Sequence, residues 1–314
     1  LSWLSQTPFS SRPCKQKSLL QNLKTVNMEF TFNEELQKIP ETFLSKEELT
    51  AIETLKLRIQ DLIQQNEDYS YDFYLMHWLR VQKYNVDKAE TMIREAVKWR
   101  TENNIQNLLE EDFDQAVDAK LHVDLNGITK EGYPINCANA GKFRVREAIN
   151  IFGKDAVYRH WFQILAKSER YILDARRKMD RESKATNQQL SLSYAKSWLI
   201  MNMTGLSLLE MLSVDVLSVM ATTFQNQVKY FPVIGGTICC VNANKFFDVA
   251  FKIISPILKG SNVSVYVFGT NEEKWKPFIL THINADQIQL VVGNGTPSEK
   301  GNENKGCLLQ KVYT

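Results

Sequence analysis

The sequence has no continuous apolar run long enough to cross a bilayer, which needs about 20 residues. Its longest apolar-looking stretch, residues 198–220, is interrupted by Asn202, Gly205, Glu210 and Asp215. An excess of one charge is also missing, since the net charge of the 314 residues is +2. Bulk electrostatic attachment to nucleic acid or to an acidic membrane is therefore not expected. Any membrane contact should be local.

Motifs for catalysis and for cofactor binding are missing as well. There is no P-loop and no G-x-S-x-G elbow for a nucleophilic serine. The four histidines are scattered without metal-ligand spacing. The five cysteines contain no C-x-x-C pair, which favours free thiols in a reducing compartment over a disulfide framework or a zinc site. We therefore expect a cytoplasmic protein that is not an enzyme and needs no cofactor or metal.

The two ends of the chain differ in composition from the rest. Residues 1–27 contain no methionine and no acidic residue, which is typical of a transit peptide. Alternatively, Met28 is the first residue of the native protein and residues 1–27 are not translated. We favour the second interpretation, because a precursor would itself begin with methionine. Residues 1–43 are thus assigned to an N-terminal extension and the polar, glycine-rich residues 297–314 to a flexible tail.

A small helical bundle is predicted over residues 44–110. Ser45 and Glu48 have the spacing of a capping box, which marks a helix start. Apolar residues at helical spacing then predict three helices, over residues 46–64, 71–82 and 87–103.

The remainder of the chain, residues 111–296, alternates between strand and helix patterns. Short apolar segments predict strands within 132–141, 197–203, 237–244 and 263–269. Helical patterns lie between them, at 155–182, 207–229 and 246–258. This β-α-β-α-β-α-β order predicts a mostly parallel sheet with crossover helices. The fold class is therefore α/β, preceded by a three-helix bundle.

The helix predicted over residues 246–258, FFDVAFKIISPIL, has nine apolar residues in thirteen. A surface helix normally has one apolar stripe, whereas this one is apolar nearly all round. The segment by itself allows two interpretations. It is either a fully buried core helix or a helix that exposes its apolar side chains on demand, for instance at a membrane.

Several motifs occur in an order that resembles the CRAL-TRIO family of lipid-binding proteins. The segment YLMHWLRVQKYNVDKAETMIREAVKWR (74–100) is similar to the helical segment of that family. The segments KYFPVIGGTICCVNANKFFDVAFKIISPIL (229–258) and VSVYVFGTN (263–271) are similar to its second signature. GYPI (132–135) and MTGLS (203–207) match landmarks between them. Among its subgroups, the sequence most resembles the supernatant-protein-factor-like members of the phosphatidylinositol-transfer-protein group.

The resemblance implies a lipid cage with a mobile apolar gate helix. It implies an intracellular carrier of one phospholipid, tocopherol, sterol or isoprenoid, with transient membrane contact. A lipid sensor that presents its ligand to a protein partner is the alternative. The protein is expected to act as a monomer and to bind no nucleic acid. The residues expected to line the lipid cavity are Ile135, Cys137, Ser197, Leu199, Met201, Ile238, Cys240, Phe247, Phe251 and Ile254. The residues expected to form the membrane gate are Phe246, Phe247, Val249, Phe251, Ile254, Ile257 and Leu258.

The match to the family's head-group contacts is incomplete. Lys83 matches a lysine that contacts phosphoinositides in relatives, so it is the candidate head-group residue. Val233 and Ser264 stand where those relatives have a glutamate and a second lysine. Asn136 replaces a tyrosine of the phosphatidylcholine site, at which Ser197 is retained. These differences predict weak inositol-phosphate binding and make a less polar ligand as plausible as a phospholipid.

Overall fold

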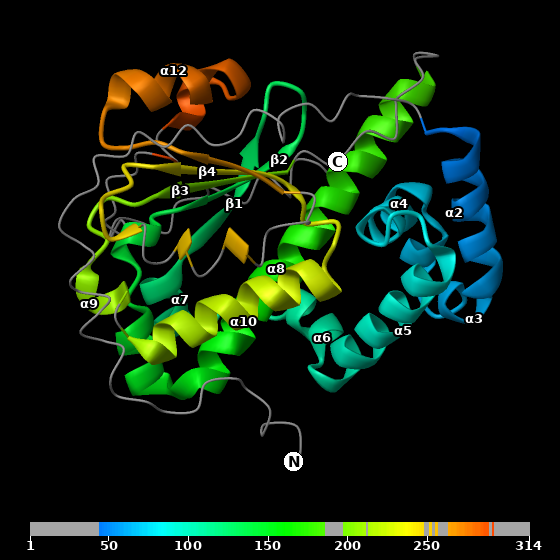
Figure 1. Ribbon diagram of the computed structural model, residues 1–314, viewed down its shortest axis with the longest axis horizontal. Coiled ribbons are helices and arrows are strands. Elements are labelled where there is room, and N and C mark those ends of the chain that lie inside the picture. The colour runs from blue at the N-terminus through cyan, green and yellow to red at the C-terminus, as the bar shows by residue number, and fades with distance from the viewer. Residues whose placement is uncertain are drawn as a thin grey trace. The chain divides into compact units, whose positions relative to one another are not determined.

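The computed structural model describes residues 44–185, 197–211, 213–247, 251–252, 255–256, 263–288 and 291 (Figure 1). All of them belong to one unit of the chain, residues 32–314. The predicted N-terminal extension and flexible tail lie outside the described residues, as does most of the apolar segment 246–258.

The first part of the described chain is helical. Its elements are α2 (Lys46–Arg58), α3 (Gln60–Ile63), η2 (Glu67–Ser70), α4 (Asp72–Val81) and α5 (Val86–Glu102). The helix α2 begins at the predicted capping box: the Glu48 amide donates to Ser45 Oγ at 3.2 Å, and the Ser45 amide donates to Glu48 Oε2 at 2.8 Å. The helices pack around large apolar side chains that include Phe73, Trp78 and Ile93. The predicted first helix is divided at Ile59, which ends α2.

His77 lies in the core of this bundle. Its ring meets that of Phe73 edge-on at 4.9 Å, and within the described residues neither of its nitrogens has a hydrogen-bond partner. Burial, assisted by the positive charges of Arg80 and Arg176, lowers the pKa of His77 to about 3. The folded protein therefore keeps this imidazole neutral under mildly acidic conditions.

Acid is expected to destabilise the protein through His77. Below pH ~6.5, the unfolded chain binds a proton at this residue that the folded chain does not bind. The contribution of His77 to the free energy of unfolding should therefore fall by about 2 kcal/mol between pH 7.5 and pH 5, at about 1.4 kcal/mol for each unit below 6.5. Urea unfolding of the native protein and of His77→Leu at the two pH values measures this. An equal loss in the variant would contradict the prediction.

Five strands are described, and they form one sheet in the order β1-β2-β3-β4-β5. They are β1 (Val123–Ile128), β2 (Pro134–Ala138), β3 (Ser197–Asn202), β4 (Gly236–Val241) and β5 (Val263–Val267). The strand β1 pairs with β2 in antiparallel orientation, and the other neighbours are parallel. The predicted α/β class with a mostly parallel sheet is confirmed.

The edge strand β1 was not predicted. Asp124, Asn126 and Gly127 are residue types that are depleted in strands, so the segment gives no clear strand pattern. The structure shows why glycine occupies position 127. A Cβ atom there would lie 2.9 Å from Cβ of Ile135 on β2, so any larger residue would push the two strands apart. The register also shifts between Asp124 and Gly127.

The other elements surround the sheet. They are α6 (Ile105–Glu110), α7 (Gln115–Leu121), η3 (Ala140–Lys142), α8 (Val145–Ala185), α9 (Leu208–Met211), α10 (Val214–Tyr230), α12 (Glu272–His282) and η4 (Ala285–Gln287). The helix α8 begins earlier than predicted and is interrupted at Gly153, which has a φ of 83°. The predicted helix 207–229 corresponds to α9 and α10. Within the described ranges, no helix combines the length and the apolar character needed to span a membrane.

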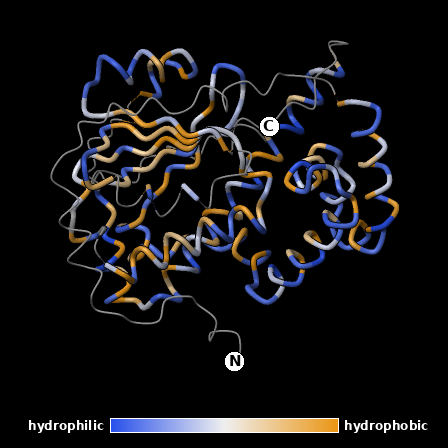
Figure 2. Tube along the Cα trace, in the orientation of Figure 1, coloured by the Kyte–Doolittle hydropathy of each residue, from blue (hydrophilic) through white to orange (hydrophobic). Residues whose placement is uncertain are grey.

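The sheet is covered on both faces. Figure 1 shows α12 on one side of it and α7, α8 and α10 on the other. Along β3, Trp198 and Ile200 pack on the side of Trp275 from α12, whereas Leu199 and Met201 pack on the opposite side. Because both faces are covered, the strands are hydrophobic along most of their length (Figure 2).

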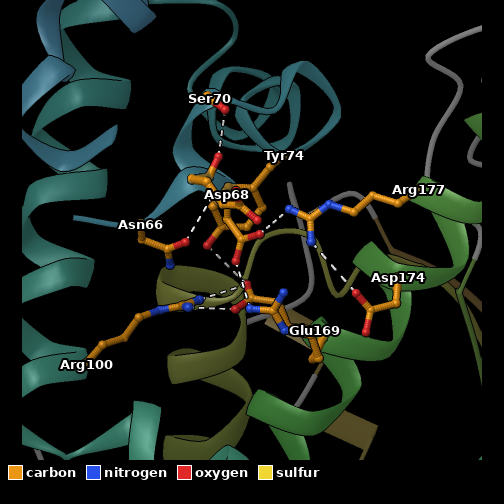
Figure 3. A network of polar contacts seen from close by, with 10 residues as sticks. Asn66, Asp68, Ser70, Tyr74, Arg100, Glu169, Asp174 and Arg177 are labelled. Carbon is orange, nitrogen blue, oxygen red and sulfur yellow. Dashed lines mark hydrogen bonds and ion pairs between the residues drawn. The ribbon is translucent and has the colours of Figure 1, made fainter. Parts of the chain in front are cut away.

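A network of ion pairs joins the helical bundle to α8 (Figure 3). The guanidinium of Arg100 donates to both carboxylate oxygens of Glu169, at 2.6 and 2.8 Å. Asp68 accepts hydrogen bonds from Arg170, at 2.9 Å, and from Arg177. Glu169 and Asp68 are 6% and 5% exposed, so these carboxylates are held in the interior. The bundle is therefore fixed to α8 by paired charges as well as by apolar packing.

Arg100 also contacts the end of a third element. Its Nη2 donates to the carbonyl oxygen of Tyr230 at 2.6 Å, and its guanidinium lies 4.3 Å from the centre of the Phe231 ring. Tyr230 is the last residue of α10, where carbonyl groups have no partner within the helix. Arg100 thus ties α5 to α8 and to α10. Burial alone would lower its pKa, but the attraction of Glu169 raises the pKa above its ordinary value.

Candidate ligand cavity

A cavity lies between the sheet and the helices α8 and α10. It holds about 1570 Å³ of space free of protein atoms, its opening to solvent included. The sheet contributes side chains from β2, β3, β4 and β5. The helices α8 and α10 contribute others, including Trp161, Leu165, Met220 and Phe224. Most of the described lining residues are apolar, so the cavity suits a hydrophobic ligand.

Seven of the ten residues predicted to face the cavity line it in the structure. They are Ser197, Leu199, Met201, Ile238, Cys240, Phe247 and Phe251. The rings of Phe247 and Phe251 stack on each other with centres 5.6 Å apart. Ile254 lies outside the described residues. Lining the cavity is a matter of geometry, and contact with a lipid stays a prediction for each of these residues.

The placement of Ile135 and Cys137 requires a correction. Both point to the other side of the sheet, where they pack in the cluster that contains Trp275 and Ile279 of α12. Their neighbours Asn136 and Ala138 line the cavity instead. All five residues of β2 are buried, because helices cover both faces. In such a strand, hydrophobicity does not distinguish the two faces.

Of the predicted gate residues, three are described. Phe247 is buried, whereas Phe246 and Phe251 are partly buried and pack against the same cluster as the cavity wall. Val249, Ile254, Ile257 and Leu258 lie outside the described residues. The gate therefore stays a prediction.

Most polar groups in the cavity are bonded to the protein itself. Ser197 Oγ donates to the carbonyl of Gly235 at 2.6 Å, and Gln227 Nε2 donates to the carbonyl of Ile234 at 3.1 Å. These bonds also hold the turn between α10 and β4 against the cavity wall. Ser197, the candidate phosphatidylcholine contact, thus already uses its hydroxyl proton within the protein.

Asn136 and Ser168 form a second polar feature of the cavity. Asn136 Nδ2 donates to Ser168 Oγ at 2.9 Å. Among the described residues, Asn136 Oδ1 has no hydrogen-bond partner although it is buried, and the same is true of Thr223 Oγ1 on α10. The sequence did not identify Ser168 or Thr223, because a lone hydroxyl residue within a helix gives no signal of a site. Nothing in the sequence indicated that the Asn136 side chain would be buried.

Charge is scarce in the cavity wall. Glu210 is the one charged side chain among the described lining residues, and one of its carboxylate oxygens accepts the Arg146 amide at 3.0 Å. Lys83 does not line the cavity. It is exposed in the turn after α4, with a φ of 50°. Val233 is fully buried against the helical bundle.

The cysteines in the described sheet are free thiols in an apolar environment. Cys240 lines the cavity, and Cys239 points to the opposite face of β4. Burial raises the pKa of Cys240 well above its ordinary value and that of Cys239 to about 12. Such thiols are protonated and poor nucleophiles. Across the described ranges, no group of three or more His, Cys, Asp or Glu side chains could hold a metal ion.

The chain is similar to a known domain family and to several characterised proteins. The model of the CRAL/TRIO domain matches residues 121–293. A SEC14 cytosolic factor of Eremothecium gossypii is 24% identical over 227 residues, covering 71% of this chain and 68% of that protein. A SEC14 cytosolic factor of Yarrowia lipolytica is 26% identical over 76% of this chain and 46% of that protein. Patellin-2 of Arabidopsis thaliana is 32% identical over 30% of this chain and 14% of that protein.

Among solved structures, the crystal structure of Sfh5 resembles this one. The TM-score is 0.54 at 14% sequence identity, and the match covers 75% of this chain and 84% of that one. At this identity the likeness shows a common fold. The family model, by contrast, matches more than half of the residues. This chain is therefore a member of the CRAL/TRIO domain family.

Proposed function

We propose that this protein carries one hydrophobic ligand in the cavity between the sheet and α8 and α10. The observation that carries the proposal is the apolar wall of that cavity in a CRAL/TRIO chain. Moving a lipid tail of about sixteen methylenes from the bilayer into water costs roughly 13 kcal/mol of free energy, at about 0.8 kcal/mol for each methylene. A carrier must return most of this free energy, which requires side chains that are apolar along the whole path.

Membrane exchange and location belong to the same proposal. Docking through the apolar segment 246–258 would open the cavity at a membrane, and the segment would close again after one lipid is exchanged. Two of the relatives carry the name SEC14 cytosolic factor, which supports a cytosolic protein that meets membranes transiently. No chemical step on the ligand is part of this mechanism, so the protein acts as a carrier and not as an enzyme.

Two measurements test the carrier function. Native mass spectrometry of the purified protein, followed by identification of the released lipid, is expected to show one ligand per chain. Each protein molecule is expected to transfer many molecules of that lipid between donor and acceptor vesicles, at a rate that does not depend on salt. Loading without transfer would favour a sensor that presents its ligand to a protein partner. Absence of loading from every vesicle composition would contradict both functions.

Replacing Phe251 by aspartate is expected to slow vesicle-to-vesicle transfer by about tenfold or more. Insertion of one phenylalanine into an apolar phase contributes about 1.5–3 kcal/mol, and a carboxylate at that place opposes insertion. The exposed neighbour Lys252 provides the control, because Lys252→Gln keeps the apolar side chains in place. Circular dichroism checks that both variants fold. A normal transfer rate for Phe251→Asp would refute the gate assignment.

A further inference from the structure

We propose that Asn136 and Ser168 bind the hydroxyl group of a neutral lipid alcohol inside the cavity. This inference rests on the proposed carrier function and specifies the chemical class of the ligand. The two residues, called the polar corner below, come from the strand β2 and the helix α8. They meet across the cavity wall, at a hydrogen bond of 2.9 Å between Asn136 Nδ2 and Ser168 Oγ.

The polar corner is buried and only half satisfied. Asn136 is 8% exposed and Ser168 is 2% exposed. Within the described part of the chain, Asn136 Oδ1 accepts no hydrogen bond. A buried acceptor without a partner destabilises the folded protein, whereas the same acceptor is satisfied when a ligand donates to it. The unpaired oxygen is therefore a place where a bound ligand gains free energy.

Ser168 supplies the complementary group. A serine hydroxyl offers one donor and two acceptor positions, and in its bond with Asn136 the Ser168 oxygen acts as acceptor. Its own proton is thus available to a ligand. A lipid hydroxyl in the corner can donate to Asn136 Oδ1 and accept from Ser168. Ester and ether oxygens cannot fill both roles, since they only accept.

The match does not depend on the orientation of the Asn136 amide. Rotating the amide by half a turn exchanges its oxygen and its nitrogen, and Ser168 then donates to Oδ1. In that case Nδ2 is left without a partner in the corner. A hydroxyl can pair with either atom because it both donates and accepts. The hydroxyl is therefore favoured in both orientations.

The charge of the wall selects against a phosphate head group at this place. The described lining residues include no lysine, arginine or histidine, and the one charged side chain is the carboxylate of Glu210. Moving an anion into such a wall costs far more than moving an alcohol, because no cation compensates for its lost hydration. The polar corner thus favours a neutral alcohol over a phospholipid.

The test compares a lipid alcohol with its methyl ether. The full-length protein is equilibrated with phosphatidylcholine vesicles that carry equal amounts of hexadecanol and hexadecyl methyl ether. It is then re-isolated, and its bound lipids are identified by mass spectrometry. The native protein is expected to capture the alcohol about tenfold over the ether, the effect of roughly one hydrogen bond to a buried polar group. In Asn136→Leu the ratio should approach one, and in Ser168→Ala it should be intermediate.

Several outcomes would overturn the inference. Equal capture of alcohol and ether by the native protein would do so, as would preferential capture of phosphatidylcholine; either result would leave the carrier function standing. A ratio that is lost in Thr223→Val but kept in Asn136→Leu would place the hydroxyl on α10 instead. Continued uptake of the ether by Asn136→Leu shows that the variant folds with an open cavity. If the native protein captures no lipid of any kind, the carrier function fails together with the inference.

Discussion

Replacing Glu169 by alanine is expected to lower the free energy of unfolding by about 3–5 kcal/mol, the effect of removing one partner of a buried ion pair. The loss arises because Arg100 stays behind in the interior without its carboxylate. The Arg100 side chain is 18% exposed and that of Glu169 is 8% exposed, so water replaces the lost partner poorly. Urea unfolding monitored by circular dichroism measures the change.

The surface pair Lys98–Glu102 provides the matched control on the same helix as Arg100. Its atoms are 4.0 Å apart, and the side chains are 78% and 61% exposed. Glu102→Ala should therefore change stability by about 0.5 kcal/mol or less. The double variant Arg100→Met with Glu169→Leu should recover much of the loss, because no buried charge is left unpaired. A loss below ~1 kcal/mol in Glu169→Ala would show that water reaches Arg100.

The Arg100–Glu169 ion pair lies next to the part of α8 that lines the cavity. Ser168, the preceding residue on α8, lines the cavity, as do Ile164 and Leu165 one turn earlier. The ion pair holds this stretch of α8 against α5 and, through Tyr230, against α10. Fixing both helices keeps the cavity wall opposite the sheet in place.

Replacing Leu199 by tryptophan is expected to reduce lipid loading at least tenfold while the protein stays folded. Leu199 lies on β3 and projects into the cavity, so the larger indole would fill space that the ligand needs. Overpacking a dense core usually costs about 1–3 kcal/mol, but here empty volume is available for the added atoms. Native mass spectrometry of the purified variant measures the loaded fraction.

The opposite face of the sheet offers the control. Tyr266 on β5 packs against Phe278 of α12, with ring centres 4.7 Å apart, and does not border the cavity. Tyr266→Trp also enlarges a partly exposed side chain of the sheet, yet it should leave loading intact. Full loading of Leu199→Trp would mean that the ligand occupies another part of the molecule.

Local patterns predicted much of the fold. The capping box at Ser45 and Glu48 involves residues three apart, so a short segment is enough to locate the start of α2. The amphipathic spacing of the bundle helices and the apolar runs of β2 to β5 are local in the same sense. The strand β1 and the helices α6, α7 and α12 were not predicted. In β1, pairing with β2 overrides the weak strand preference of Asp124, Asn126 and Gly127.

The candidate site depended much less on local pattern. The resemblance carried by the order of motifs implied a lipid cavity, and Leu199, Met201, Ile238 and Cys240 do line the cavity between the sheet and the helices α8 and α10. The prediction of which β2 side chains face the cavity was wrong, because a strand buried on both faces has no polar side to mark its orientation. Asn136 therefore took the place expected for Ile135 and Cys137.

What the sequence by itself determined is the class of the fold and the position of most of the described helices and strands. These features follow from periodicity and composition, which act over a few residues. Only the tertiary structure decided that Arg100 meets Glu169 and that Asn136 meets Ser168. Each pair joins elements far apart in the chain. Such contacts are set by how helices and sheet pack together, and no local pattern encodes them.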